Sequence, residues 1–204
     1  MNGNYRLGLA ANFTKPLDKK QNLTLTSSAS GTFRHGVDLI GIGESTEATR
    51  SSVGTWNGYG SLRLNYKMGK HTFGAKGNMS VNRSDSEREG FVASTLWDYN
   101  YGVTALIQLP LKLQLSSDLT IYSRRGYGDY GLNTNDLVWN ARLSYKLLKP
   151  NLTFAVDGFD LLGNLHNTAL TMNSQGKIET YRNALPRYVM FHVICRFAKQ
   201  PKKK

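Results

Sequence analysis

Apolar and polar residues alternate one by one along most of this chain. In the segment 5–13 the odd positions are Tyr, Leu, Leu, Ala and Phe, and the even positions are Arg, Gly, Ala and Asn. Successive side chains of a β-strand point to opposite faces, so this pattern predicts a strand with one apolar and one polar face. The same alternation recurs at 22–34, 56–67, 73–82, 97–109, 113–121, 137–146, 152–157 and 188–197. The sequence therefore predicts an all-β fold, an antiparallel meander of about nine amphipathic strands.

Strands of soluble sandwiches also alternate, so other features must separate a sandwich from a membrane barrel. Many of these segments are about ten residues long, which suits a strand that crosses a bilayer at a tilt, whereas soluble strands average five or six residues. Aromatic side chains also lie near the ends of the apolar rows, where membrane barrels carry their interfacial girdles. They are Tyr5, Phe13, Trp56, Tyr66, Trp97, Tyr99, Tyr145 and Phe197.

The connections expected between these strands alternate between short and long. The short ones are 15–21, 68–71, 109–112 and 147–151, and the long ones are 35–54, 83–92, 124–135 and 159–186. In an antiparallel meander all the short connections then lie at the same end of the strands. Outer-membrane barrels have this arrangement, with short periplasmic turns and longer external loops. The pattern predicts that residues 1–204 are a single segment of a transmembrane outer-membrane β-barrel, with a basic periplasmic tail at 198–204.

Composition and charge agree with this interpretation. Hydrophobic residues make up 40% of the chain, and no stretch approaches the roughly 18 unbroken apolar residues of a membrane helix. A membrane barrel can have so low a hydrophobic content, because its lipid-facing apolar residues alternate with polar residues that face the lumen. The net charge is +12, but the lysines cluster in the expected turns and tail rather than on one face of a helix. We therefore expect the lipid bilayer to be a partner of this chain, and we do not expect nucleic acid to be one.

Candidate chemistry is sparse. A single cysteine, Cys195, excludes an internal disulfide framework, and the four histidines (His35, His71, His166 and His192) have no metal-ligand spacing. No nucleophile elbow or phosphate-binding loop is present. We expect neither an enzyme nor a cofactor. The acids of the long connections are interpreted as solvated loop residues, with a metal or substrate role as the alternative: Glu44, Glu47, Asp85, Glu87, Glu89, Asp129 and Glu179.

The chain resembles a known family over nearly its whole length, and the motifs specific to that family lie after about Asn135. The stretch Phe159-Asp160-Leu161-Leu162-Gly163, the stretch from Tyr181 to Phe191 and the tail from Gln200 to Lys204 are similar to the end of Bacteroidetes outer-membrane barrel proteins of the TonB-dependent receptor group. The resemblance implies a barrel of about 22 strands around a plug domain, and energised uptake of a ligand across the outer membrane. It implies that the rest of the barrel and the plug are partners of this chain.

The resemblance also gives roles to residues of the last strand. Phe191, Val193 and Phe197 would form the signature that the barrel-insertion machinery recognises, and His192 and Arg196 would face the lumen. Nine strands is an odd number, whereas bacterial single-chain barrels close with an even one, so the chain is expected to be the C-terminal part of a larger barrel. A small stand-alone barrel with a structural or adhesion role, and a soluble carbohydrate-binding sandwich, are the alternatives. The sequence does not identify the ligand.

Overall fold

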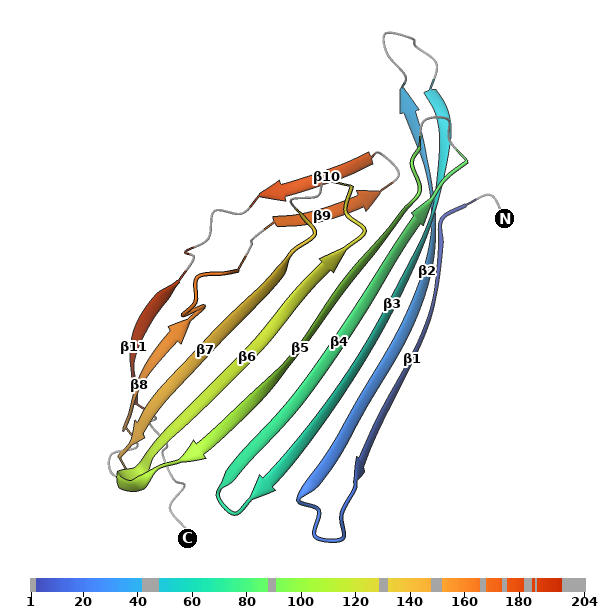
Figure 1. Ribbon diagram of the computed structural model, residues 1–204. Coiled ribbons are helices and arrows are strands. Elements are labelled where there is room, and N and C mark those ends of the chain that lie inside the picture. Colours follow the sequence, from blue (N-terminus) through green and yellow to red (C-terminus); the bar gives the residue numbers. More distant parts are fainter. Residues whose placement is uncertain are drawn as a thin grey trace, which may run out of the picture.

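The computed structural model describes residues 3–41, 48–87, 91–128, 132–147, 152–165, 168–173, 176–181, 185 and 187–195. Nine strands form one antiparallel sheet, and their order in the sheet follows their order in the chain (Figure 1). Their bounds are β1 Tyr5–Pro16, β2 Leu23–Gly41, β3 Ala48–Met68, β4 His71–Asp85, β5 Ser94–Gln108, β6 Leu113–Arg125, β7 Asn135–Lys146, β8 Leu152–Phe159 and β11 Tyr188–Cys195. The predicted all-β meander of about nine strands is confirmed.

The connections β1–β2, β3–β4 and β5–β6 lie at the lower end of the sheet in Figure 1. The predicted sorting into short and long connections does not hold throughout, because β2 ends at Gly41 and β3 begins at Ala48, a gap as short as that between β1 and β2. The β3–β4 turn consists of Gly69 and Lys70, and Gly69 takes a φ of 60°, which glycine adopts without strain. The β5–β6 turn contains the short 3-10 helix η1 (Pro110–Lys112).

Two predicted connections contain strand. The β2–β3 pairing continues from His35 opposite Gly54 up to Gly41 opposite Ala48, so the predicted loop 35–54 is wrong over most of its length. The ladder continues because paired strands satisfy their backbone hydrogen bonds wherever side chains permit, even where alternation is no longer clear. The connection 159–186 contains a separate hairpin of β9 (Thr168–Asn173) and β10 (Gly176–Tyr181).

The register gathers the apolar positions of all nine strands on one face of the sheet. Leu7 lies opposite Phe33 and Phe33 opposite Trp56, and Val103, Leu119 and Trp139 continue the same face across β5, β6 and β7. This face carries the even positions of β3 and β8 and the odd positions of the other seven strands. A slip of one residue between any two strands would send one set of apolar side chains to the opposite face.

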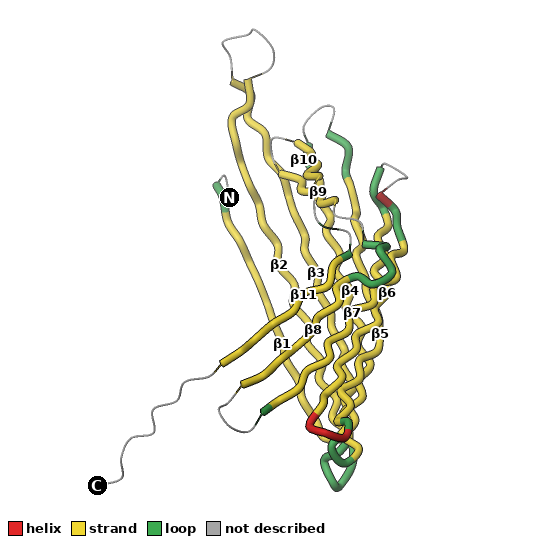
Figure 2. The backbone as a smooth tube through the Cα atoms, turned by 90° about the vertical axis from the view of Figure 1, so that its left-hand side faces the viewer, coloured by secondary structure: helices red, strands yellow, loops and turns green. Residues whose placement is uncertain are grey.

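The sheet is curved, and the apolar face is its outer side. In Figure 2 the edge strands β1 and β11 bend to the same side of the central strands β4 to β7. We call the apolar side the convex face and the polar side the concave face. The strand residues that are buried and hydrophobic, Val53, Leu96, Val138 and Ala155, all occupy concave-face positions, because side chains on the inner side of a curve are drawn together.

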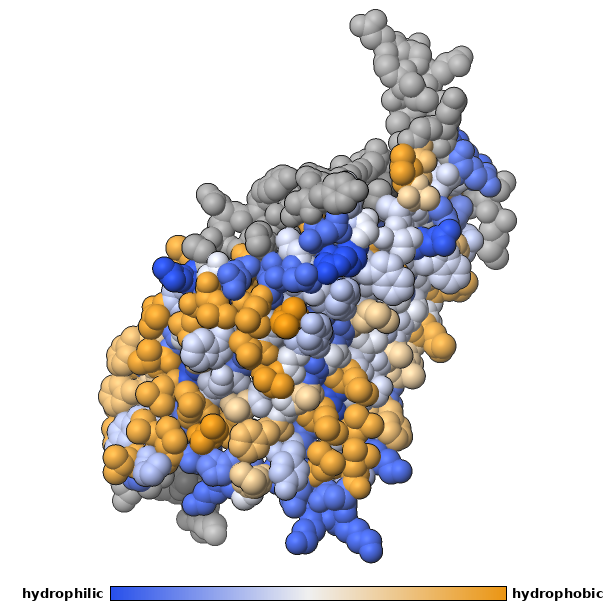
Figure 3. Space-filling model, in the orientation of Figure 1, coloured by the Kyte–Doolittle hydropathy of each residue, from blue (hydrophilic) through white to orange (hydrophobic). Residues whose placement is uncertain are grey.

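The convex face carries a broad exposed band of apolar side chains. Leu9 is 81% exposed, Val103 56% and Phe191 64%. Figure 3 views this face and shows hydrophobic residues gathered over its middle and lower part, with hydrophilic residues above and below them. An exposed apolar patch of this extent is rare in soluble monomers and indicates contact with a partner or with a membrane.

Candidate functional site

On the concave face, uncharged side chains of β3, β4 and β5 hydrogen-bond to one another. Tyr59 on β3 donates its hydroxyl proton to Asn78 on β4 (3.2 Å), and Asn78 donates its amide to Asn100 on β5 (2.7 Å). One row further along, Asn82 donates to Asn57 at 2.7 Å. Asn78 both accepts and donates, whereas Asn100 and Asn57 accept through their side-chain oxygens, so their amide N–H groups are not used in these bonds. The face can present a hydrogen-bonding surface to a polar ligand.

A charged pair on this face spans three strands. Lys76 of β4 pairs with the Asp118 carboxylate of β6, and Thr120 also donates to that carboxylate at 2.6 Å. The strand between them contributes Gly102, which lies opposite both Lys76 and Thr120. A Cβ at Gly102 would lie 2.3 Å from the carbonyl oxygen of Leu119 and 2.7 Å from Thr120 Oγ1. Glycine at this position therefore lets the two charged side chains meet across β5.

A second charged cluster lies near the other edge of the sheet. The buried Asp157 carboxylate on β8 is 3.4 Å from Arg142 Nε on β7 and 2.8 Å from His192 Nε2 on β11. The carboxylate thus bridges the last three strands on the concave face. This cluster ties the edge strand β11 to its neighbours through side chains as well as through the backbone ladder.

The connection between β6 and β7 is anchored to the top of this face. Tyr127 shares its hydroxyl proton with both carboxylate oxygens of Asp98, at 2.9 and 3.1 Å. The Tyr127 carbonyl accepts the side-chain amide of Asn133 at 2.8 Å. Burial of the phenol, followed by the charge and hydrogen bond of Asp98, raises the pKa of Tyr127 to about 12. The phenol therefore stays protonated at every physiological pH.

The turn after β8 is organised by one carboxylate. Asp160 is 5% exposed and accepts the backbone N–H groups of Asn164 and Leu165 at 3.2 and 2.9 Å. Its own N–H donates to the Asn140 side chain at 2.9 Å. The Phe159–Gly163 stretch, which carries part of the family resemblance, therefore has a clear structural role as a turn.

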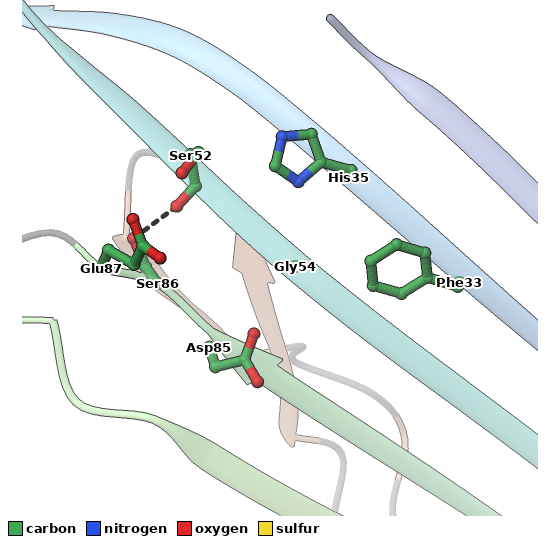
Figure 4. A pocket seen from close by; sticks show the side chains of 7 residues that line it. All are labelled: Phe33, His35, Ser52, Gly54, Asp85, Ser86 and Glu87. Carbon is green, nitrogen blue, oxygen red and sulfur yellow. Dashed lines mark hydrogen bonds between the residues drawn. The ribbon is translucent and has the colours of Figure 1, made fainter. Parts of the chain in front are cut away.

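The convex face holds a pocket of about 500 Å³ at the upper end of β2, β3 and β4 (Figure 4). It is lined by Phe33, His35, Ser52, Gly54, Asp85, Ser86 and Glu87. Gly54 forms the floor, because it lies directly between His35 on β2 and Asp85 on β4. A Cβ on Gly54 would come within 2.8 Å of Asp85 Oδ1 and 3.6 Å of the Phe33 ring.

Neighbouring side chains fix the walls of this pocket. The rings of Tyr5 and His35 stack with centroids 5.2 Å apart, and Phe33 lies 4.4 Å from Trp56. On the other side Arg83 Nε is 3.8 Å from Asp85 Oδ2. An aromatic wall therefore faces a carboxylate wall across a glycine floor.

The predicted residues of the last strand fall on alternate faces. Phe191 and Val193 are on the convex face, exposed by 64% and 56%. His192 is on the concave face beside Asp157, and its predicted position toward a lumen stays a prediction. Arg196 and Phe197 lie outside the described residues. Cys195 is an exposed free thiol at the end of β11.

Sequence reasoning missed the sites that depend on register. Asp85 and Glu87 are identified from the sequence only as loop acids, and His35 only as a histidine without ligand spacing, although all three line the convex pocket. Gly54 is the signal that could have revealed the pocket. Once the strands are aligned, this glycine lies opposite both His35 and Asp85, and it has no side chain to fill the space between them.

Within the described residues, no three His, Cys, Asp or Glu side chains are grouped so that they could hold a metal ion. No helix in the described part of the chain is long and apolar enough to cross a membrane. Comparison with protein-family models, with curated proteins and with solved structures gave no match. The family resemblance noted in the sequence therefore stays a prediction.

Proposed function

We propose that this chain forms part of the wall of a bacterial outer-membrane β-barrel, with its convex face against lipid and its concave face toward the lumen. The observation that carries the proposal is the continuous exposed apolar band across all nine strands. On the convex face of the described strands, charged side chains occur near strand ends, at Lys15, Arg50, Arg83, Asp85 and Arg125. Between them, β3 runs from Trp56 to Tyr66 and β5 from Trp97 to Ile107 without a charge on this face, about the length that a tilted strand needs to cross a bilayer.

The concave face supports the other half of the proposal. Two salt bridges lie on it, Lys76 with Asp118 and Asp157 with Arg142, and several of its amides hydrogen-bond to one another. Charges and amides of this kind are costly against lipid and favourable against water, so they suit a lumen. The resemblance of the C-terminal third suggests that the lumen serves uptake of a ligand by a receptor of the TonB-dependent type.

This function gives the chain four partners. The bilayer covers the convex face, further strands of the barrel pair with the edges β1 and β11, and a plug domain fills the space in front of the concave face. The barrel-insertion machinery would recognise the last strand through Phe191, Val193 and Phe197. No partner in this scheme is a nucleic acid, because the lysines lie in turns and in the tail.

Tryptophan fluorescence tests the placement of the convex face. The three tryptophans, Trp56, Trp97 and Trp139, all occupy convex-face positions. In vesicles of lipids brominated along the acyl chain, we expect strong quenching of their emission and weak quenching by aqueous iodide. A chain that stays in the soluble fraction, with tryptophans open to iodide and unaffected by bromolipid, would instead be a soluble β-sandwich.

A blot against the peptide 187–204 in fractionated cells separates the receptor from a small barrel. A large detergent-extracted band in the outer membrane supports the receptor. A band near 22.8 kDa in the same fraction would indicate a stand-alone barrel with a structural or adhesion role.

A further inference from the structure

The pocket on the convex face has a different chemistry from the band beneath it. Immediately below it lie the rings of Phe33 and Trp56, 4.4 Å apart, and above it the chain continues as the long β2–β3 hairpin. If the apolar band spans the bilayer, as proposed above, the aromatic rings mark its interface. The pocket then opens sideways into the layer of lipid headgroups, on the side of the long connections.

The pocket offers mainly hydrogen-bond acceptors. Asp85 and Glu87 contribute carboxylates, and Ser52 and Ser86 contribute hydroxyls. The Asp85 carboxylate is near Arg83, but at 3.8 Å with the two side chains 49% and 61% exposed, this is a weak surface pair that leaves acceptor positions open. None of the described residues that line the pocket is a Lys or an Arg. Its two carboxylates favour a ligand rich in hydroxyl donors.

Its shape favours a ring. Neighbouring strands lie about 4.8 Å apart, so the backbones that carry His35 and Asp85 are separated by roughly twice that distance, with only Gly54 between them. Phe33 gives one side of this space an apolar wall, and the carboxylates give the other side a polar one. A pyranose fits such a site, because its C–H groups pack on an aromatic ring while its hydroxyls donate to carboxylates. The volume of about 500 Å³ lies within the range of small-molecule sites.

We propose that this pocket binds one sugar ring of a glycolipid headgroup at the surface of the outer leaflet. The inference rests on the proposed function for the position of the pocket relative to the bilayer. A free saccharide has the same chemistry, so the experiment must distinguish the lipid from the free sugar.

The test is native mass spectrometry of the full chain in a sugar-free zwitterionic detergent. Glucosyl diacylglycerol, phosphatidylcholine and phosphatidylethanolamine are titrated separately, and methyl glucoside serves as the free sugar. We expect one glucosyl diacylglycerol to bind at least tenfold more tightly than either phospholipid. Equal retention of all three lipids would overturn the proposal, and preference for phosphatidylethanolamine would replace the sugar by an amine. Methyl glucoside binding as tightly as the glycolipid would keep the sugar but overturn its lipid source.

Matched variants locate the binding site. Gly54→Val fills the floor of the pocket and should lower glycolipid affinity at least tenfold. Gly60→Val is the control, because Gly60 lies on the same face of the same strand and nothing lies within 4 Å of a Cβ placed there. Equal losses in both variants would overturn the assignment. Asp85→Asn with Glu87→Gln keeps the shape of the pocket, so a severalfold loss in this variant tests the acceptors even if Gly54→Val fails to fold.

Bromolipid quenching of the same preparations separates this inference from the proposed function. Normal quenching without selective glycolipid binding would reject the pocket alone. Loss of quenching in the wild-type chain would reject the membrane placement itself.

Discussion

Single carboxylates organise several of the connections in this protein. Asp160 has a φ of 42°, a left-handed conformation that Asp tolerates better than most residues because its side chain can bond to nearby backbone groups. It uses that capacity here, since its two carboxylate oxygens accept the N–H groups of Asn164 and Leu165. At the other turns the same kind of residue recurs, as Asp18 accepts the N–H of Leu23 at 2.8 Å.

Replacement of Asp160 should therefore loosen the end of β8. In Asp160→Ala two backbone donors lose their partners, and we expect the free energy of unfolding to fall by about 1–2 kcal/mol. Asp160→Asn keeps one acceptor oxygen and should lose about half as much. Urea unfolding in detergent micelles measures both variants. An unchanged midpoint in Asp160→Ala would mean that the turn does not depend on this carboxylate.

Tyr127 gives a prediction in the alkaline range. Its pKa is raised to about 12 in the folded chain, whereas an ordinary phenol in the unfolded chain has a pKa of about 10. Below pH 10 the phenol is protonated in both states and its stabilising contribution is fully present. As the pH rises from about 10 through about 12, the unfolded chain ionises first, so this contribution is lost.

Ultraviolet titration of tyrosinate should show this group directly. We expect one late-ionising phenol that disappears in Tyr127→Phe. In Asp98→Asn the pKa of Tyr127 should fall only part of the way, because burial is the largest cause of the shift and the Asp98 charge the second. If the late phenol persists in Tyr127→Phe, another tyrosine is responsible.

At the scale of the strand, alternation separates two environments within one element. In β3 Leu62 is on the convex face and Tyr59 on the concave face, and they are exposed by 55% and 44%. By exposure alone the two positions are nearly equivalent. They differ in what the proposed function places in front of them, which is lipid for Leu62 and water for Tyr59.

A lysine at each position distinguishes these environments. If the convex face lies in a bilayer, Leu62→Lys should destabilise the folded chain in vesicles by about 2–4 kcal/mol, the cost of a lysine near the bilayer midplane. Tyr59→Lys loses one exposed hydrogen bond and should cost less than about 1 kcal/mol. Denaturant unfolding of both variants in phosphatidylcholine vesicles gives the comparison. Equal and small effects would argue that the convex face is in water.

At the scale of the whole molecule, the sheet is curved but open. Among the described strands, β1 and β11 each pair with one neighbour, so alternate backbone N–H and C=O groups along both strands point away from the sheet. In a bilayer every such group without a partner costs several kcal/mol. The curvature and the open edges together suit a sheet that further strands complete.

Hydrogen exchange can show whether that completion occurs. In this polypeptide alone, in detergent, we expect slow exchange in β4, β5 and β6 and fast exchange at alternate amides of β1 and β11. In the native outer membrane, those alternate edge amides should become as slow as the central ones, because new strands pair with them. Fast exchange at both edges in native membranes would contradict a closed barrel that includes this chain.

Much of the architecture could be read from the sequence because alternation is a local property. Residues 5–13 or 97–109 show which positions share a face without reference to any other strand, and Gly69 with Lys70 shows where a tight turn fits. The loop prediction for 35–54 is wrong because pairing between β2 and β3 continues through residues whose pattern is irregular. Whether such a segment is strand or loop depends on its pairing with a distant part of the chain, which the pattern of neighbouring residues does not show.

The sequence by itself determined the central parts of the nine strands and their two faces, since these depend on neighbouring residues only. The tertiary structure decided which residues meet. Lys76 and Asp118 pair across Gly102, and the convex pocket joins residues from three strands over Gly54. These side-chain contacts depend on the register between strands and on the curvature of the sheet. Both are set by interactions between segments far apart in the chain, so alternation alone leaves them open.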